Sequence, residues 1–105
     1  MVNVDDFGAV GDGRTGNADA IEKACQADNL IEFTAGKTYY VERTIDIGSD
    51  RELQGNMARI VYDGKFFGLF KGNNNLINGF VFDGRGIELV IDENTVEHPP
   101  VDRIT

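Results

Sequence analysis

The chain has 105 residues, and 41% of them are hydrophobic, which is enough for one globular domain with a small core and too many for a disordered tail. With 18 acidic and 10 basic residues the net charge is −8 at pH 7, which argues against a nucleic-acid partner and against an anionic membrane surface, since both need clustered cations. No apolar run is long enough for a transmembrane helix, and no basic segment leads into an apolar one at the start, so we expect neither membrane insertion nor a signal peptide.

The first third of the chain predicts a strand, a set of turns and a helix. Residues 2–4 alternate in the manner of a strand. Residues 5–16 are predicted to form turns, because glycine adopts positive φ values without steric cost; the glycines are Gly8, Gly11, Gly13 and Gly16. Asn17 is a favourable N-cap for a helix over 18–27. The apolar face of this helix consists of Ile21, Ala24 and Cys25.

The cysteine and histidine content excludes several kinds of site. Cys25 is the single cysteine, so an intrachain disulfide and a cysteine-based zinc site are excluded, and its apolar surroundings predict a buried structural thiol. His98 is the single histidine, and it stands before two prolines without sequence neighbours that would complete a catalytic or metal site. The sequence therefore predicts no metal ligands and no cofactor-binding residues.

Beyond residue 29 the pattern changes from helical to strand-like. Short β-rich runs follow, most of them directly before Gly, Asn or Asp; they are 30–33, 38–41, 44–47, 52–54, 59–62, 68–70, 76–77, 80–82 and 87–91. Val61-Tyr62-Asp63-Gly64 recurs further along the chain as Val81-Phe82-Asp83-Gly84. Repeats of about 20 or more residues, built from strands and turns, are typical of a parallel β-helix, and the sequence has room for about three coils. A β-meander or a small β-barrel is the alternative.

The opening motif resembles a known family. Asp6-Phe7-Gly8-Ala9-Val10-Gly11-Asp12-Gly13-Arg14-Thr15 resembles the start of the pectate-lyase-like superfamily of right-handed parallel β-helices. The segments 31–39 and 53–56 are similar to the strand and turn that follow in that family. Two departures are Gly16-Asn17, where the family has two aspartates, and Thr34-Ala35, where prolines often stand.

This resemblance implies a mainly β fold in three parts. Residues 1–29 are expected to form an N-terminal cap of a strand, a glycine-rich loop and a short α-helix. Residues 30–92 are expected to form the first coils of a right-handed parallel β-helix, and residues 93–105 an exit loop or linker. The cap covers the apolar end of the stack, with Phe7 and Val10 expected to close the top of the core.

Four groups of residues are candidates for chemistry or binding. The loop from Gly8 to Gly13 lacks the spacing and the lysine of a phosphate site, so it is interpreted as a structural turn. Asp63 and Asp83 recur at equivalent positions, which suits either turns or a carboxylate pair for glycoside hydrolysis. Residues 73–75 are three asparagines that suit a ladder or a polar turn. An aromatic set suits either core packing or sugar stacking: Tyr39, Tyr40, Tyr62, Phe66 and Phe67.

The catalytic signatures of the polygalacturonases in this superfamily are absent as motifs, so no catalytic residue is assigned. The resemblance implies the capping and initiating segment of a protein that binds or degrades polysaccharide by hydrolysis or β-elimination. It is most like a bacteriophage tailspike, a homotrimer of the virion tail that attaches to the host surface. One alternative is a fragment of a secreted, extracellular bacterial pectin-type lyase or glycoside hydrolase. Another is a stand-alone carbohydrate-binding or assembly module.

Overall fold

The computed structural model describes residues 1–62 and 70–83, and the backbone of two further strands at 95–97 and 103–104. Its helices are the 3-10 helix η1 (Val4–Phe7) and α1 (Ala18–Ala27). Its strands are β1 (Val2–Asn3), β2 (Asp12–Gly16), β3 (Leu30–Glu32), β4 (Thr38–Tyr40), β5 (Ile45–Ser49), β6 (Glu52–Gln54), β7 (Arg59–Val61), β8 (Phe70–Asn73), β9 (Asn75–Asn78), β10 (Val81–Asp83), β11 (Thr95–Glu97) and β12 (Arg103–Ile104).

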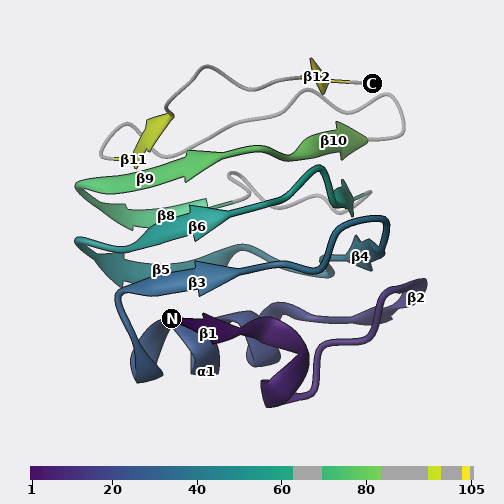
Figure 1. The fold of residues 1–105 in the computed structure, drawn as a ribbon, viewed down its shortest axis with the longest axis horizontal. Coiled ribbons are helices and arrows are strands. Elements are labelled where there is room, and N and C mark those ends of the chain that lie inside the picture. Colours follow the sequence, from purple (N-terminus) through teal and green to yellow (C-terminus); the bar gives the residue numbers. More distant parts are fainter. Residues whose placement is uncertain (63–69, 84–94, 98–102, 105) are drawn as a thin grey trace.

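The strands form a parallel β-helix. One sheet has the order β1-β3-β6-β9-β11, a second has the order β12-β10-β7-β4-β2, and β5 pairs with β8 in a third. Every strand pairing in the described residues is parallel, which rules out the β-meander for this part of the chain. The chain thus passes through the sheets in turn and rises by one level with each coil (Figure 1). The predicted fold class is confirmed.

Side chains that point inward stack in rows from coil to coil. One row joins Ile31, Leu53 and Ile77, and another joins Tyr39, Ile60 and Phe82; all six are buried. Stacking of this kind is required because a single coil cannot bury its own apolar face. Aromatic rings fill the space between the sheets, with Phe33 edge-on to both Tyr39 and Phe80 at centroid distances of 5.2 and 4.8 Å.

The internal repeat marks neighbouring coils, but its alignment differs from the pairing register. β10 lies beside β7, as the repeat predicts, and Val81 is opposite Arg59 rather than Val61. The strands are therefore paired two residues away from the alignment that the repeat suggests. A shift of this size leaves every side chain on the same face of the sheet, so the inward pattern survives.

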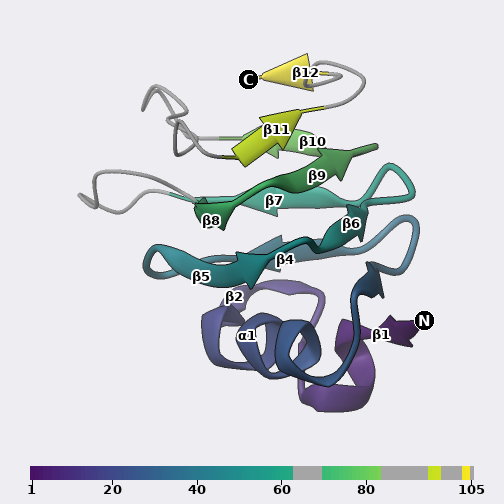
Figure 2. The same ribbon diagram turned by 90° about the vertical axis from the view of Figure 1, so that its left-hand side faces the viewer.

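The N-terminal cap covers one end of the stack. α1 lies across this end, next to β5 and below the first coil (Figure 2). The predicted apolar face of α1 is confirmed, since Ile21, Ala24 and Cys25 are all buried. Burial raises the pKa of the Cys25 thiol to about 12, as expected of an unreactive structural cysteine. No helix in the described residues is long and apolar enough to span a membrane.

The residues that close the top of the core differ in part from the prediction. Val4 and Ala9 are buried there, and Phe7 packs against the core while remaining partly exposed. The prediction was wrong for Val10, which is 42% exposed. Its backbone N–H and C=O are both bonded to the side chain of Asn17, which fixes the loop with the Val10 side chain outside.

Two segments expected to be loops contain strands. β2 lies within the predicted turn region and pairs with β4 through an irregular register, where Asp12 accepts bonds from the backbone N–H groups of Arg14 and Thr15. β11 and β12 lie within the expected exit loop and pair in parallel with β9 and β10. The predicted strand at 87–91 lies outside the described residues.

Candidate functional site

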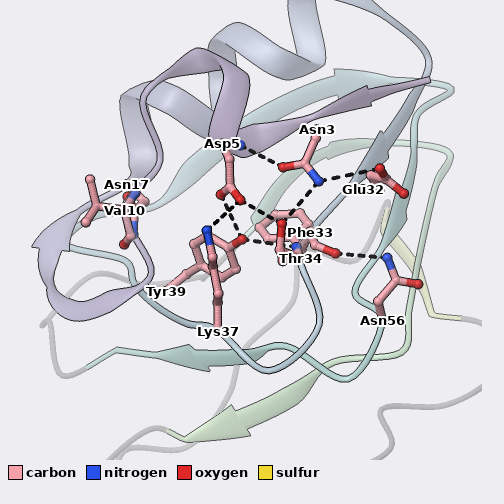
Figure 3. Close-up of polar contacts among 10 residues, drawn as sticks. All are labelled: Asn3, Asp5, Val10, Asn17, Glu32, Phe33, Thr34, Lys37, Tyr39 and Asn56. Carbon is pink, nitrogen blue, oxygen red and sulfur yellow. Dashed lines mark hydrogen bonds and ion pairs between the residues drawn. The ribbon is translucent and has the colours of Figure 1, made fainter.

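A polar cluster joins the cap to the first coil (Figure 3). The carboxylate of Asp5, which directly precedes the opening motif, accepts hydrogen bonds from Thr34 Oγ1 at 2.6 Å, Lys37 Nζ at 2.9 Å and Tyr39 OH at 2.9 Å. Asn3 orients the aspartate by accepting a bond from its backbone N–H at 2.8 Å. A single carboxylate of the cap thus holds three side chains of the first coil.

Local structure places each member of this cluster. Asp5 lies in η1, while Thr34 and Lys37 flank the tight turn between β3 and β4, whose Gly36 has φ 79°. Tyr39 is fully buried, and its hydroxyl also accepts a bond from the backbone N–H of Thr34 at 3.0 Å. The backbone of the first coil therefore positions Thr34 and Tyr39, while the half-exposed Lys37 reaches Asp5 with the end of its long side chain.

The electrostatics of this cluster suit anchoring rather than acid–base catalysis. Partial burial acts to raise the pKa of Asp5, but the bonds from Thr34, Lys37 and Tyr39 outweigh it and lower the pKa below its usual range. The bond to Asp5 raises the pKa of Lys37, and burial raises the pKa of Tyr39. All three pKa values move away from neutral pH, whereas a catalytic acid or base needs a pKa close to the working pH.

A second polar region lies where the chain turns from β5 into β6 and from β8 into β9. A groove of about 470 Å³ runs along these turns and the start of β3. We call it the turn groove; its walls include Asn29, Leu30, Asp50, Glu52, Asn74 and Leu76. Its residues come from three successive levels of the stack, because β3, β6 and β9 are neighbours in one sheet.

Two side chains hold the turns beneath this groove. Asn75 is 1% exposed; its Oδ1 accepts a bond from the Arg51 backbone N–H and its Nδ2 donates to the Gly48 carbonyl, both at 2.8 Å. Arg51 donates from Nε to the Cys25 carbonyl at 2.6 Å and from Nη1 to Asn29 Oδ1 at 3.0 Å. The turn residues Asp50 and Asn74 both have φ 60°, a conformation that these short polar side chains tolerate.

Comparison with known proteins agrees with this fold. A family model described as Rhamnogalacturonase A/epimerase, pectate lyase-like, matches residues 1–99. The chain belongs to this pectate lyase-like family. No curated protein and no solved structure matches the chain. The superfamily resemblance of the opening motif is thereby shown, and the family carries the association with polysaccharide-degrading β-helices.

The structure of this pectate lyase-like chain locates one member of the predicted carboxylate pair. Asp83 ends β10, with its Oδ2 3.5 Å from Arg59 Nη1 on the neighbouring strand. Asp63 lies outside the described residues, as does His98. The described part of the chain contains no group of three or more His, Cys, Asp or Glu side chains placed to hold a metal ion.

The aromatic candidates divide between core and surface. Tyr39 and Tyr62 are buried, so core packing is their role, and Tyr40 is half-buried on the outer side of β4. Phe66 and Phe67 lie outside the described residues. The asparagine run does form a polar turn: Asn74 donates to Asp50 Oδ1 at 2.7 Å, one level below it, and Asn75 bridges the same two levels.

Sequence reasoning missed both the Asp5 cluster and the turn groove. Asp5 directly precedes the matched motif, and the three side chains that it binds carry no recognisable pattern. The turn groove joins residues that are far apart in the sequence, and only the stacking of strands brings them together. The available signal was the recurrence of Asn or Asp shortly before a strand, at positions 29, 50 and 74.

Proposed function

We propose that this chain caps and initiates the β-helix of a protein that binds and degrades polysaccharide, most like a phage tailspike acting on bacterial surface polysaccharide. The observation that carries the proposal is the closed end of the stack, where α1 and η1 cover the first coil. A parallel β-helix left open there exposes apolar rows and unpaired strand edges, which promote aggregation. In this proposal the described residues have a structural role.

The catalytic step is assigned to residues outside those described. Glycosidic-bond hydrolysis needs two carboxyl groups, one of which is protonated near neutral pH, and β-elimination needs a base beside a uronate. This assignment rests on the absence of the polygalacturonase signatures from the sequence; in addition, four of the described carboxylates, Asp5, Asp12, Glu22 and Asp28, have lowered pKa values and are therefore poor proton donors. Assembly as a homotrimer in a virion tail completes this proposal.

A second candidate is a secreted bacterial enzyme of the pectin-degrading type. The family description favours it, because it names rhamnogalacturonase A and an epimerase. It shares the capping role of residues 1–29 with the tailspike proposal. The two candidates differ in substrate and location: a bacterial surface polysaccharide at a virion tail, against a plant-type uronate polymer outside the cell.

The test is a paired activity assay on the protein isolated from its source. The protein is incubated separately with purified capsule, lipopolysaccharide, polygalacturonate and rhamnogalacturonan, and the release of reducing ends and of unsaturated uronates is followed. Cleavage of a capsule or lipopolysaccharide alone supports the tailspike proposal, and cleavage of the pectic substrates alone supports the secreted enzyme. Absence of cleavage with retained binding overturns both in favour of a carbohydrate-binding module.

The capping role has its own test. Ile21 is buried on the inner face of α1, so Ile21→Asp places a charge against the apolar end of the stack. Lys23→Asp, on the exposed face of the same helix, is the matched control. We expect Ile21→Asp alone to form soluble aggregates in light scattering. Aggregation of neither variant, with Ile21→Asp still folded, contradicts the proposal that α1 protects this end.

A further inference from the structure

The turn groove presents side chains from the same register position on three successive levels. Leu30, Glu52 and Leu76 are direct register partners on β3, β6 and β9, so they form one line across the outer face of the sheet. Neighbouring strands lie about 4.8 Å apart, so register positions recur at that interval along the stack, and the two leucines lie two intervals apart with Glu52 between them. That interval is close to the length of one pyranose unit, so a polymer along the stack axis meets one level per sugar.

The chemistry of the turn groove combines apolar and hydrogen-bonding surface. Leu30 and Leu76 are half-buried and offer aliphatic surface to the C–H faces of a sugar ring. Asn29, Asp50 and Asn74 are exposed along the turn and offer amide and carboxylate groups to ring hydroxyls. A predominantly apolar floor with a few placed polar groups is typical of small-molecule and oligosaccharide sites.

The charges in the groove select against acidic sugars. Asp50 and Glu52 both line it as carboxylates, against the single guanidinium of Arg51, which donates to the Cys25 and Ser49 carbonyls and to Asn29 Oδ1, so two negative charges and one positive charge leave the lining at −1. The chain as a whole carries a net charge of −8. A uronate polymer would bring further carboxylates beside Asp50 and Glu52 and would be repelled, whereas a neutral chain would not.

We propose that the turn groove binds a sugar chain without carboxylate groups, lying along the stack axis with one sugar unit on each level. This inference rests on the proposed function in assuming that the protein acts on polysaccharide, and it adds a non-catalytic contact and its selectivity. The site lies on the coils nearest the cap, so it holds the polymer at the capped end of the β-helix. Recognition here depends on hydroxyl groups and ring faces rather than on charge.

Residue-specific titration by NMR tests the site directly. The isotope-labelled chain is titrated with N-acetylchitohexaose and xylohexaose as neutral probes and with hexagalacturonate as the acidic probe. We expect at least one neutral probe to shift the signals of Asn29, Asn74 and Leu76, and hexagalacturonate to bind about tenfold more weakly or not at all. Shifts elsewhere, or no shifts with either neutral probe at millimolar concentration, overturn the proposal.

Variants separate the apolar and the charge contributions. Leu30→Ala with Leu76→Ala removes the aliphatic floor and is expected to weaken neutral binding about tenfold. Asp50→Asn with Glu52→Gln removes both carboxylates, and asparagine tolerates the φ of 60° at position 50. We expect this pair to gain binding of hexagalacturonate. If acidic binding is unchanged, the electrostatic part of the proposal is overturned.

Two controls keep these outcomes interpretable. Lys23→Ala, on the exposed face of α1, should bind like the parent chain. The folding of every variant is checked by its thermal midpoint, and a misfolded pair is replaced by the single change Leu76→Ala. Cleavage of polysaccharide by the protein without shifts in the turn groove overturns this inference alone. Shifts in the groove without any cleavage overturn the enzymatic part of the proposed function and leave the groove assignment standing.

Discussion

The side chain of Glu42 caps the helix that begins at Ala18: its Oε1 accepts a hydrogen bond from the Ala18 backbone N–H at 3.0 Å. Asn17 occupies the N-cap position but makes no side-chain capping bond. A carboxylate from a distant part of the sequence therefore provides what the neighbouring residue does not, and its charge also favours the positive end of the helix dipole. Gly16 makes room for it, because a Cβ there would clash with the Glu42 carboxylate.

The first prediction concerns this remote cap. Glu42→Ala removes the acceptor and should lower the free energy of unfolding by about 1 kcal/mol, as for a lost N-cap. Glu42→Gln keeps an acceptor oxygen and should lose less than half of that, since only the charge is removed. Urea unfolding followed by circular dichroism measures both, with Lys23→Ala as the control. Equal losses in the two Glu42 variants would show that the charge, and not the hydrogen bond, stabilises α1.

The second prediction is an acid dependence centred on Asp5. The pKa of Asp5 is lowered from the ordinary value of 3.8 in the folded chain, so its bonds contribute full stability above that value and lose it as the pH falls through the folded-state pKa. Asp5→Asn should therefore be less stable at neutral pH, and its deficit should shrink as the pH falls below 3.8. Unfolding curves collected from neutral to strongly acidic pH measure the deficit.

The matched control for the acid dependence is Asp6→Asn, at the exposed neighbouring position. It should follow the parent chain at every pH, within about 0.5 kcal/mol. A constant deficit for Asp5→Asn across the pH range would mean that the cluster stabilises the fold through shape rather than through the ionised carboxylate.

The third prediction contrasts two glycines. A Cβ on Gly55 would lie 2.6 Å from the Gly79 carbonyl oxygen, on the next coil, whereas Gly48 has open space around it and only a φ of 81°. Gly55→Ala must push two coils apart and should cost about 3 kcal/mol, at the upper end for overpacking. Gly48→Ala should cost about 1 kcal/mol of backbone strain. The difference in unfolding midpoints measures this contrast, and equal midpoints would mean that moving the coils apart costs no more than the backbone strain at Gly48.

The fourth prediction concerns the buried Asn75. Asn75→Leu leaves the Arg51 N–H and the Gly48 C=O without their partner inside the turn, at a cost of about 2–4 kcal/mol for two unmet groups. Asn73→Leu, at an exposed position on the preceding strand, is the control and should change stability by less than about 0.5 kcal/mol. Thermal unfolding compares them, and similar midpoints would place Asn75 outside the forces that hold the turn.

Sequence periodicity was sufficient to predict the helix and the strands that bury an apolar face. The helix over 18–27 and the strands 30–33, 38–41 and 52–54 match the structure closely, because each buries an apolar face that its residues display in order. The role of Asn17 could not be predicted from the sequence pattern. A local capping rule considers only the residues nearby, whereas the Asn17 amide bonds both backbone groups of Val10 and leaves the cap to Glu42.

The turn groove and the Asp5 cluster were harder to predict from the sequence than the fold, for a related reason. Which residues meet across coils depends on the offset between stacked strands, and the offset varies. Glu52 is opposite both Leu30 and Leu76, yet it lies closer in the sequence to Leu30 than to Leu76. No constant spacing in the sequence therefore predicts that Asn29, Asp50 and Asn74 lie in one groove. The Asp5 cluster likewise depends on where the turn after β3 returns the chain.

The same variable offset indicates where this scaffold accepts new sequence. Each strand is held by the strands above and below it, so a longer turn changes one coil locally and leaves the neighbouring rows aligned. The exposed Ala35-Gly36 turn has room for an insertion, since nothing lies within 4 Å of the place where a Cβ on Gly36 would stand. Because Thr34 and Lys37 on either side of it bind Asp5, a peptide epitope grafted there would be displayed beside the capped end at the cost of the Asp5 cluster.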